Sequence, residues 1–395
     1  MMAIPWLDRI RSRLVQFARL FLQARKKWRS YEVYWSALLI FAASRLVVIV
    51  GINFGRLLVI IPDPNRTDVG PAWYYRLLRW DSEWYAAIVS HGYRYSDDHS
   101  VEGPTVFYPL YPLVTYVIKS LFGIDHFVAL LLVANIGSLV AALLMTKFVK
   151  DELGDETALL ALAFFCFFPS SLFLSAGYTE SLYLVFVLLS FIFMSREKFA
   201  PAAAMAGLSL GTRSIGIVMI PVILWEMGRG NIRRWPRLLL KMALCGLLAA
   251  SGLLIYMAYL GIKFGHPLAF VTVEAAWHGG TFVDRFVSAV TLANFRHSNL
   301  WPTGWFLCFL ALSVWSFWRL RFALSLYALG ALAVPYLTLG ITDSMSRYVL
   351  VCFPAFMCMG ILCKGRPWLV CAIIGIFAAL LLQTAAMFSQ WYWVA

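Results

Sequence analysis

The sequence predicts an all-α polytopic membrane protein, and three bulk properties support this fold class. Hydrophobic residues make up 62% of the 395 residues, and the mean hydropathy is +0.76. Charged residues make up only 13%, about half of their share in soluble domains. Apolar runs long enough for a transmembrane helix recur along nearly the whole chain. They lack the strict alternation of apolar and polar residues that is typical of membrane β-barrel strands.

Residues 1–32 predict a basic amphipathic helix on the cytoplasmic side of the membrane. Between Trp6 and Phe21 the apolar side chains fall on one helical face, and the arginines lie mainly elsewhere. Such a helix lies in the plane of the membrane interface. The segment lacks the short apolar core and small-residue site of a cleavable signal, so we expect it to be retained. Residues 33–395 then predict a single transmembrane domain.

Clusters of Lys and Arg between the apolar runs define the predicted topology. The strongest cluster lies in residues 228–241, and others lie in residues 25–29, 196–198, 319–321 and 364–366. The positive-inside rule places these connectors on the cytoplasmic side. Topology therefore explains the net charge of +13, and we expect membrane lipids rather than nucleic acid as a partner.

This topology predicts about 11 transmembrane helices and two large extracytoplasmic loops. The loops comprise about residues 54–125 and 261–299. The predicted helices comprise residues 33–53, 126–148, 157–175, 181–195, 199–211, 214–227, 237–260, 300–318, 322–341, 346–363 and 367–389.

Two segments leave alternatives open. Residues 107–123 are apolar but short, and two prolines interrupt their start, so we predict a juxtamembrane helix in the first loop rather than a further span. Residues 199–227 are predicted to break at Gly211. An arginine at bilayer depth, here Arg213, costs about 3 kcal/mol or more unless it faces water or a partner. The alternative is one long helix with a buried, paired Arg213.

Polar and aromatic side chains from five remote segments meet at the extracytoplasmic side on this topology. Carboxylates there can deprotonate an acceptor hydroxyl, and arginines can hold a phosphate leaving group. The pattern predicts a catalytic cavity at the outer water–lipid boundary, where a lipid-linked substrate meets a polar one. The polar residues are Arg79, Asp81, Glu83, His91, Tyr178, Glu180, Arg213, His266, Glu274, Trp277, Asp343, Arg347 and Tyr348.

Each of these residues also has a structural explanation. Asp81 and Glu180 are placed to stabilise helix N-termini, and Arg347 can extend to lipid headgroups. The Asp-Asp-His stretch at residues 97–99 has the side chains of a metal site, but a solvated loop is the favoured interpretation. The six histidines include no pair at the spacing of a zinc site, so we expect no metal.

The stretch RWDSEWYAAIVSHGY (residues 79–93) resembles the WDxxxYxxIxxxGY segment of the PIG-V family of mannosyltransferases. Later elements are similar to that family in order and placement. GTRSIGIV departs from the family pattern, because Ile215 stands where the family has Asn. The matches extend from about residue 79 to residue 354, and the later elements are FYPLYPL (107–113), GYTESLY (177–183), GTRSIGIV (211–218), GHPLAF (265–270) and SRYVLVCFP (346–354).

The resemblance implies a GT-C fold and a membrane glycosyltransferase. Its donor would be a polyprenyl-phosphate sugar, with mannose as the sugar, and its acceptor a lipid-linked or glycan hydroxyl. Transfer would occur on the extracytoplasmic side with inversion at the anomeric carbon, and it would need no metal or other cofactor. We expect the polyprenyl chain along residues 107–123. The compact chain favours a location in a bacterial cytoplasmic membrane over the endoplasmic reticulum. Whether a small membrane subunit is a partner is left open.

The resemblance also implies roles for individual residues. Asp81 is the general base and Glu180 an auxiliary acidic residue, and we add Glu83 to the expected catalytic group because it lies beside Asp81. Arg213 and Arg347 are expected at the donor phosphate on grounds of charge and side. The full set of expected substrate-binding residues is Arg79, Trp80, Tyr85, His91, Tyr108, Tyr178, Arg213, His266, Trp277, Arg347 and Tyr348.

A transporter or flippase of a lipid-linked substrate is the alternative function. It predicts inverted repeats and charged groups at mid-membrane. The sequence has no convincing internal repeat, and its polar groups are predicted at one edge, which favours the transferase. A scaffold that keeps the fold without chemistry is a second alternative, and the presence of Asp81 disfavours it.

Overall fold

A computed structural model of the chain describes residues 5–62, 65–66, 70, 72–96, 101–229, 235–278, 281–292 and 300–394. The side chains of residues 5–30, 235–236 and 278 lie outside this description. The described residues form helices and irregular connections and contain no β-strand. This confirms the all-α prediction.

The helices follow the predicted order along the chain. Both large predicted loops contain helices, although the sequence predicted them only in the first. The elements are α1 (Pro5–Leu58), η1 (Trp73–Leu77), α2 (Asp81–His91), η2 (Pro104–Val106), α3 (Leu110–Phe122), α4 (His126–Leu153), α5 (Asp155–Phe167), η3 (Pro169–Leu174), α6 (Glu180–Met194), α7 (Phe199–Thr212), η4 (Ser214–Val218), α8 (Met219–Gly228), α9 (Trp235–Phe264), α10 (Ala269–His278), α11 (Phe282–Val290), α12 (Leu300–Ser316), α13 (Phe322–Leu339), α14 (Met345–Tyr348), η6 (Val349–Val351), α15 (Phe353–Cys363) and α16 (Pro367–Ser389).

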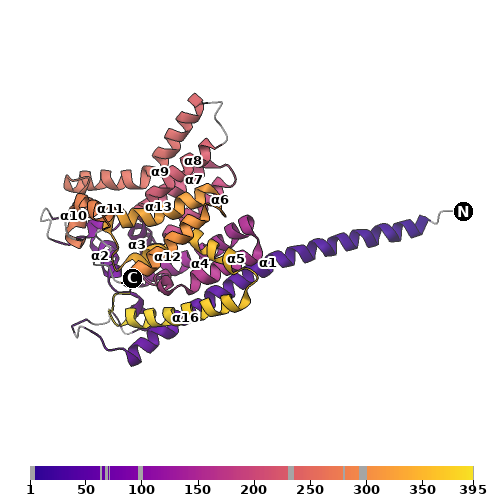
Figure 1. Ribbon diagram of the computed structural model, residues 1–395, viewed down its shortest axis with the longest axis horizontal. Coiled ribbons are helices and arrows are strands. Elements are labelled where there is room, and N and C mark those ends of the chain that lie inside the picture. The colour runs from indigo at the N-terminus through magenta and orange to yellow at the C-terminus, as the bar shows by residue number, and fades with distance from the viewer. Residues whose placement is uncertain are drawn as a thin grey trace.

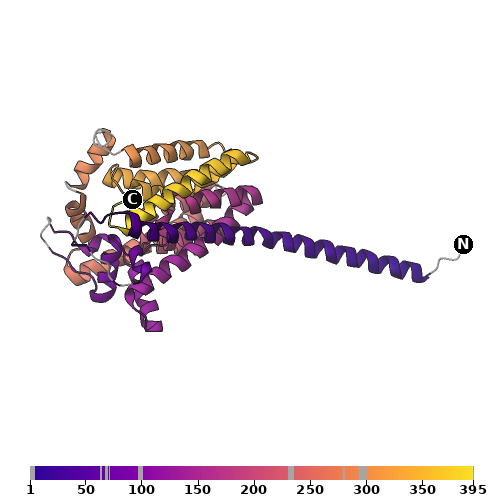
Figure 2. The same cartoon turned by 90° about the horizontal axis from the view of Figure 1, so that it is seen from below.

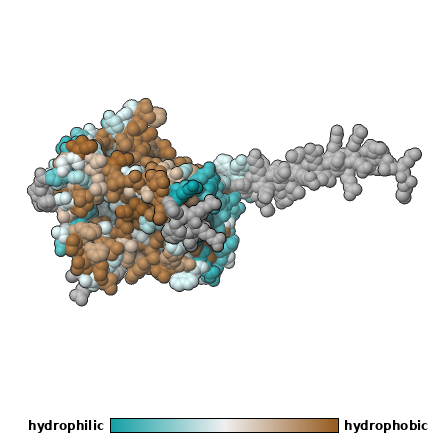
Figure 3. Space-filling view, turned by 90° about the horizontal axis from the view of Figure 1, so that it is seen from above, coloured by the Kyte–Doolittle hydropathy of each residue, from teal (hydrophilic) through white to brown (hydrophobic). Residues whose placement is uncertain are grey.

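Several of these helices have the length and composition of membrane spans, as an integral membrane protein requires. Among the described residues, five helices are long and apolar enough to cross a bilayer, or six if the bent pair of α14–η6 and α15 is one span. Further apolar helices, such as α6 and α7, are shorter, so the count of about 11 spans stays a prediction. Apolar side chains cover much of the surface in the view of Figure 3, as expected for contact with lipid.

The helical bundle has two distinct ends. α2, α10, α11 and the C-terminus lie at one end, which we call the α2 end, and the N-terminal part of α1 extends from the opposite end (Figure 1, Figure 2). α1 runs without a break through the boundary predicted at residue 32. The predicted position of residues 1–32 at the membrane interface stays a prediction.

α5 and η3 replace the single helix that was predicted for residues 157–175, and that part of the prediction is wrong. α5 ends at Phe167 because Pro169 has no amide hydrogen to continue the helix. The buried Arg45 of α1 occupies the break. Its guanidinium donates to the carbonyl oxygens of Cys166 at 3.0 Å and Ser171 at 2.8 Å. A membrane arginine thus satisfies carbonyls that the broken helix leaves without partners.

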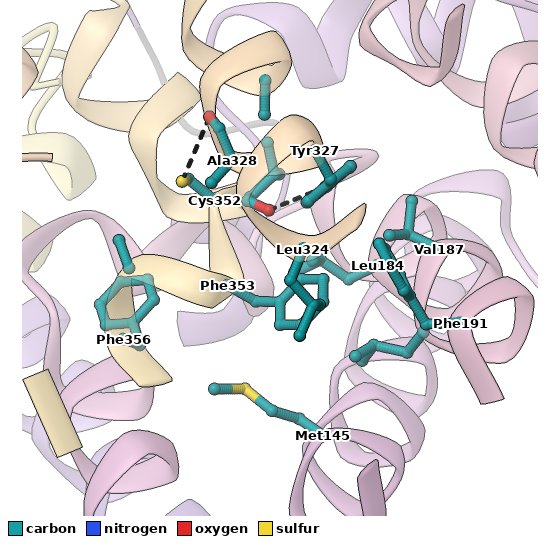
Figure 4. Close-up of a cluster of buried hydrophobic side chains, with 14 of the residues drawn as sticks. Met145, Leu184, Val187, Phe191, Leu324, Tyr327, Ala328, Cys352, Phe353 and Phe356 are labelled. Carbon is teal, nitrogen blue, oxygen red and sulfur yellow. Dashed lines mark hydrogen bonds between the residues drawn. The ribbon is translucent and has the colours of Figure 1, made fainter. Parts of the chain in front are cut away.

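A second break divides the helix that was predicted for residues 346–363. The axis bends by 75° between Met345–Val351 and Phe353–Cys363, where Pro354 opens α15. The hydroxyl of Tyr327 donates to the carbonyl of Val351 at 2.9 Å, and the thiol of Cys352 lies 3.6 Å from the carbonyl of Ala328 (Figure 4). α13 thereby stabilises the bend.

A third break lies at Arg213 and confirms the prediction that residues 199–227 are not one helix. α7 ends at Thr212, and Arg213 has an extended backbone with φ −152° and ψ 145°. The break lies two residues beyond the predicted Gly211. Residues 107–123 contain α3, which has 13 residues and spans only about 20 Å. Because α6 and α7 are similarly short, the juxtamembrane position of residues 107–123 stays a prediction.

α7 and α9 pack through glycines, as is common in membrane bundles. A Cβ atom at Gly252 of α9 would collide with the carbonyl oxygen of Gly207 and with the backbone of Gly211. The backbones of the two helices are therefore in direct contact, which is possible only because Gly252 has no Cβ atom.

Gly252→Ala should destabilise the protein by about 1–3 kcal/mol, because the added methyl group forces the two helices apart. Gly246→Ala is the matched control on the same helix, since a Cβ atom there lies 3.9 Å from the side chain of Leu224. Thermal unfolding of the detergent-solubilised protein measures both changes. Equal unfolding midpoints for the two variants would contradict the close packing of α7 and α9.

Candidate active site

Asp81 is the first residue of α2 and follows a strained residue. Trp80 has φ 56° and ψ −115°, a combination that is rare for a bulky side chain and persists only where packing enforces it. The Trp80 ring packs edge-on against Trp391 and Trp393, with centroids 6.1 and 5.6 Å away. This turn places the Asp81 carboxylate at a helix N-terminus, where the helix dipole favours negative charge.

Arg347 of α14 is the direct partner of Asp81. Its Nη1 donates to Asp81 Oδ2 at 2.5 Å. The Arg347 side chain is 8% exposed and that of Asp81 is 17% exposed. The aromatic rings of Tyr178, Tyr348 and Trp393 lie 5.2–5.6 Å from the guanidinium carbon of Arg347. Such rings stabilise a cation that is shielded from water.

Glu180 is buried behind two arginines at the start of α6. Its Oε1 accepts from Arg213 Nη1 at 2.5 Å and lies 3.3 Å from Arg347 Nε. Arg213 Nη1 also donates to Thr179 Oγ1 at 2.8 Å. The Glu180 side chain is fully buried. The order Asp81, Arg347, Glu180, Arg213 forms a neutral chain of alternating charges, which we call the charge chain.

A cavity of about 740 Å³ lies at the α2 end beside the charge chain, within the usual size range of small-molecule sites, roughly 300–1,000 Å³. Asp81, Arg213 and Arg347 all line it, whereas Glu180 does not. Glu180 therefore positions the arginines from behind. The other lining residues include Arg66, Trp80, Glu83, Trp84, Tyr85, Glu102, Phe107, Tyr108, Glu274, Trp277, Arg285, Tyr348 and Trp393.

An aromatic wall faces the cavity from both large predicted loops. Trp277 of α10 packs edge-on against Trp84 and Phe107, with centroids 5.3 and 5.7 Å away. Phe107 also packs against Tyr85 at 5.0 Å. Aromatic faces of this kind suit the flat apolar faces of sugar rings. Glu274 and Tyr108 line the cavity beside this wall.

Glu83 also lines the cavity but differs from Asp81 in its surroundings. Its carboxylate lies 3.6 Å from Arg66 Nη1 and is 41% exposed. Burial raises the pKa of Glu83, and the charges of Arg66 and Arg79 act in the opposite direction. Glu83 is therefore easier to protonate than an ordinary glutamate. Among the three predicted catalytic acids, Asp81 is the one that both lines the cavity and belongs to the charge chain.

Four of the predicted substrate-binding residues lie away from the cavity lining. Arg79 is fully buried, and its guanidinium donates to the carbonyl of Ser389 at 3.2 Å. The Tyr178 hydroxyl donates to the carbonyl of Arg79 at 3.1 Å. His91 is exposed at the end of α2, and His266 is exposed and packs against Tyr95 at 5.3 Å. These contacts give Arg79 and Tyr178 a structural role in holding the start of α2.

The sequence did not single out several residues that line the cavity. Arg285 of the second predicted loop is an arginine on the predicted outer side, and the argument used for Arg213 and Arg347 applies to it equally. Trp393 and Glu102 carried no comparable signal. Residues 97–99 lie outside the described residues, and no group of three potential metal ligands occurs among the residues that were described.

Comparison with known families identifies the chain. The family profile described as Mannosyltransferase (PIG-V) matches residues 69–309, more than half of the sequence. The chain belongs to the PIG-V mannosyltransferase family. This confirms the resemblance that the motifs between residues 79 and 354 indicated, and the matched region contains Asp81, Glu180 and Arg213.

Mammalian proteins are similar to part of the chain. GPI alpha-1,6-mannosyltransferase 2 of Rattus norvegicus is 28% identical over 166 residues, which cover 39% of this chain and 32% of the rat protein. The Homo sapiens protein of the same name is 23% identical over 164 residues. The match therefore spans about a third of the length of these relatives. The predicted bacterial location stays a prediction.

Two solved structures align with most of the chain. The oligosaccharyltransferase of Archaeoglobus fulgidus aligns with 89% of this chain and 53% of its own, at 14% identity and a TM-score of 0.49. ArnT from Cupriavidus metallidurans, bound to undecaprenyl phosphate, aligns with 90% of this chain and 76% of its own, at 13% identity and a TM-score of 0.49.

Glu180→Gln should lower the free energy of unfolding by about 3 kcal/mol, because it removes one charge from a buried set and leaves two arginines to share Asp81. Asp81→Asn also removes one negative charge, but from a side chain that borders the cavity, so it should lower the free energy of unfolding by less. Thermal unfolding in detergent compares the two variants. If Glu180→Gln unfolds no earlier than Asp81→Asn, Glu180 does not hold the arginines as described.

Proposed function

We propose that this PIG-V family member is a membrane glycosyltransferase that transfers mannose from a polyprenyl-phosphate donor to a hydroxyl of a lipid-linked or glycan acceptor. The observation that carries this proposal is the Asp81–Arg347 pair at 2.5 Å, on the wall of a cavity of about 740 Å³. Mannose is supported by the family and by the name of the rat relative. The acceptor is proposed only as a chemical class, a hydroxyl of a lipid-linked or glycan molecule.

The reaction is proposed to occur on the extracytoplasmic side. The cavity lies at the α2 end, opposite the N-terminal part of α1. Residues 25–29 of that part are strongly basic, and the positive-inside rule places them in the cytoplasm. The α2 end then faces the outer leaflet, where a lipid-linked donor can enter from the membrane.

Asp81 is proposed as the general base of an inverting displacement. The Asp81 carboxylate takes the proton of the acceptor hydroxyl. At the same time, the oxygen of that hydroxyl bonds to the anomeric carbon of the donor. The bond between that carbon and the phosphate oxygen breaks, and polyprenyl phosphate leaves with the electron pair. A general base of this kind contributes about 10² to 10⁴ in rate.

Arg213 and Arg347 are proposed to bind the phosphate of the donor. Both guanidinium groups line the cavity, and the fork of an arginine side chain fits phosphate oxygens in a bidentate way. Glu180 holds both groups in place from behind. These two arginines are proposed to neutralise the negative charge of the leaving phosphate without a metal ion. The aromatic wall of Trp84, Phe107 and Trp277 is proposed to bind the acceptor.

Asp81→Asn should lower kcat by about 10² to 10⁴ while the protein still inserts and folds. Glu83→Gln is the matched control, since it neutralises a second carboxylate of α2 on the same cavity wall, and we expect its effect to be less than about tenfold. Transfer from radiolabelled polyprenyl-phosphate mannose to a membrane lipid extract measures both. Retained transfer by purified Asp81→Asn would remove Asp81 from the mechanism.

Arg213→Lys should raise KM for the donor about tenfold, because an ammonium group does not reproduce the bidentate contact of a guanidinium with phosphate. The control is Arg321→Lys, which makes the same change in an Arg–Glu pair with Glu152, whose charged atoms are 2.7 Å apart, away from the cavity. Steady-state kinetics with varied donor concentration measures both. Equal KM values for the two variants would exclude Arg213 as a phosphate ligand.

A further inference from the structure

A second cavity of about 370 Å³ lies beside the proposed active site. Trp301 and Pro302 of α12 form one side, and Leu380, Gln383 and Met387 of α16 form the other. We call it the lateral groove. Trp301 is 43% exposed and Gln383 is exposed, so the rim of the groove is open to the outside of the bundle.

Aromatic side chains pack between α12 and α16 one turn beyond the groove residue Trp301. Trp305, one turn beyond Trp301, packs against Phe377 of α16 at 5.8 Å and against Phe168 at 4.7 Å. The hydroxyl of Thr384, which faces the groove, donates to the carbonyl of Pro169 at 2.8 Å. The Thr384 hydroxyl is therefore bound internally. Asp343 and Gln383 are the other polar members of the lining, and the remaining side chains make the groove a largely apolar slot between α12 and α16.

Trp393 is the wall that the lateral groove shares with the active-site cavity, because it lines both. Its ring centroid lies 5.6 Å from the guanidinium carbon of Arg347 and 5.6 Å from the ring of Trp80. The groove thus begins next to the arginine that is proposed to bind the donor phosphate. A single side chain separates an apolar slot from the charged end of the cavity.

We propose that the lateral groove binds the first isoprene units of the polyprenyl-phosphate donor. This inference depends on the proposed function, since it assumes a donor whose phosphate lies at Arg347. The prenyl chain is esterified directly to that phosphate, so it must leave the cavity close to Arg347, where Trp393 borders the groove. Burial of the chain against apolar side chains stabilises the bound donor in proportion to the area removed from water.

This position differs from the one that the sequence suggested along residues 107–123. α3 presents an exposed apolar face, with Leu113 55% and Tyr116 52% exposed. Within the described residues, however, no member of α3 lines the cavity, and the nearest cavity residue in sequence is Tyr108. The charge chain and the lateral groove, in contrast, are joined through one residue.

Photo-crosslinking locates the chain directly. Purified full-length protein in detergent is irradiated with a prenyl phosphate that carries a diazirine on its first isoprene units, and the labelled peptides are identified by mass spectrometry. Labels on α12 near Trp301 and on α16 between Leu380 and Met387 support the proposal. Labels confined to α3 overturn it.

Kinetics with a blocked groove provides the second test. Leu380→Trp fills the lateral groove and should raise KM about tenfold both for undecaprenyl-phosphate mannose and for its geranyl analogue, because the two isoprene units of the geranyl chain are the ones that the groove would bind. The control is Leu307→Trp, at an α12 position that is 48% exposed and lines neither cavity. Equal KM values for Leu380→Trp and Leu307→Trp would overturn the proposal that the lateral groove binds the donor chain. If the wild-type protein transfers no mannose from either donor, the proposed function itself fails.

Discussion

The charge chain of Asp81, Arg347, Glu180 and Arg213 is the interaction on which the site depends. A buried charge without a partner costs several kcal/mol even after the protein relaxes around it, whereas the complete set is neutral. Its four members come from α2, α6, the Arg213 break and α14. Segments that are as far apart in the sequence as residues 81 and 347 are thus joined by a 2.5 Å hydrogen bond. The chain therefore stabilises the arrangement of the helices and presents the carboxylate of Asp81 to the cavity.

Each member of the charge chain lies where regular structure stops. Asp81 follows the strained Trp80, Glu180 is the first residue of α6, Arg213 has an extended backbone, and Arg347 lies before the 75° bend at α15. A straight helix would direct these side chains along its sides into lipid or into neighbouring helices. Breaks allow them to point toward one another at the end of the bundle. Such local departures from ideal geometry are found mainly at functional sites.

Hydropathy and charge were sufficient to predict the all-α class and most of the long apolar helices, because both depend on each segment alone. The break near Arg213 was predictable for the same reason, since an arginine at bilayer depth needs a partner or water wherever it lies. The break after Phe167 was not predicted, although Pro169 is a local signal for it. The contact that occupies this break could not be predicted locally, because Arg45 is 121 residues away from Cys166. Arg79 shows a second long-range contact. It stands directly before the matched motif that begins at Trp80, and it binds the carbonyl of Ser389, 310 residues away. Roles that depend on such long-range contacts cannot be read from local composition.

The pairing of Asp81 with Arg347 raises a chemical difficulty that the proposed reaction resolves. A carboxylate that takes up a proton loses the charge that its hydrogen bond to a guanidinium depends on, so the cation is left without its anionic partner. In the proposed transfer, however, Asp81 loses its negative charge as it takes the proton, while the leaving phosphate gains negative charge as its bond to the sugar breaks. Arg347 lies between the two groups and can shift its hydrogen bonds from Asp81 to the phosphate as the charge moves. Glu180 stays ionised behind it and keeps the guanidinium in place. The arginine that pairs with Asp81 in the resting site would then stabilise the leaving group in the transition state, which is where such an interaction accelerates the reaction.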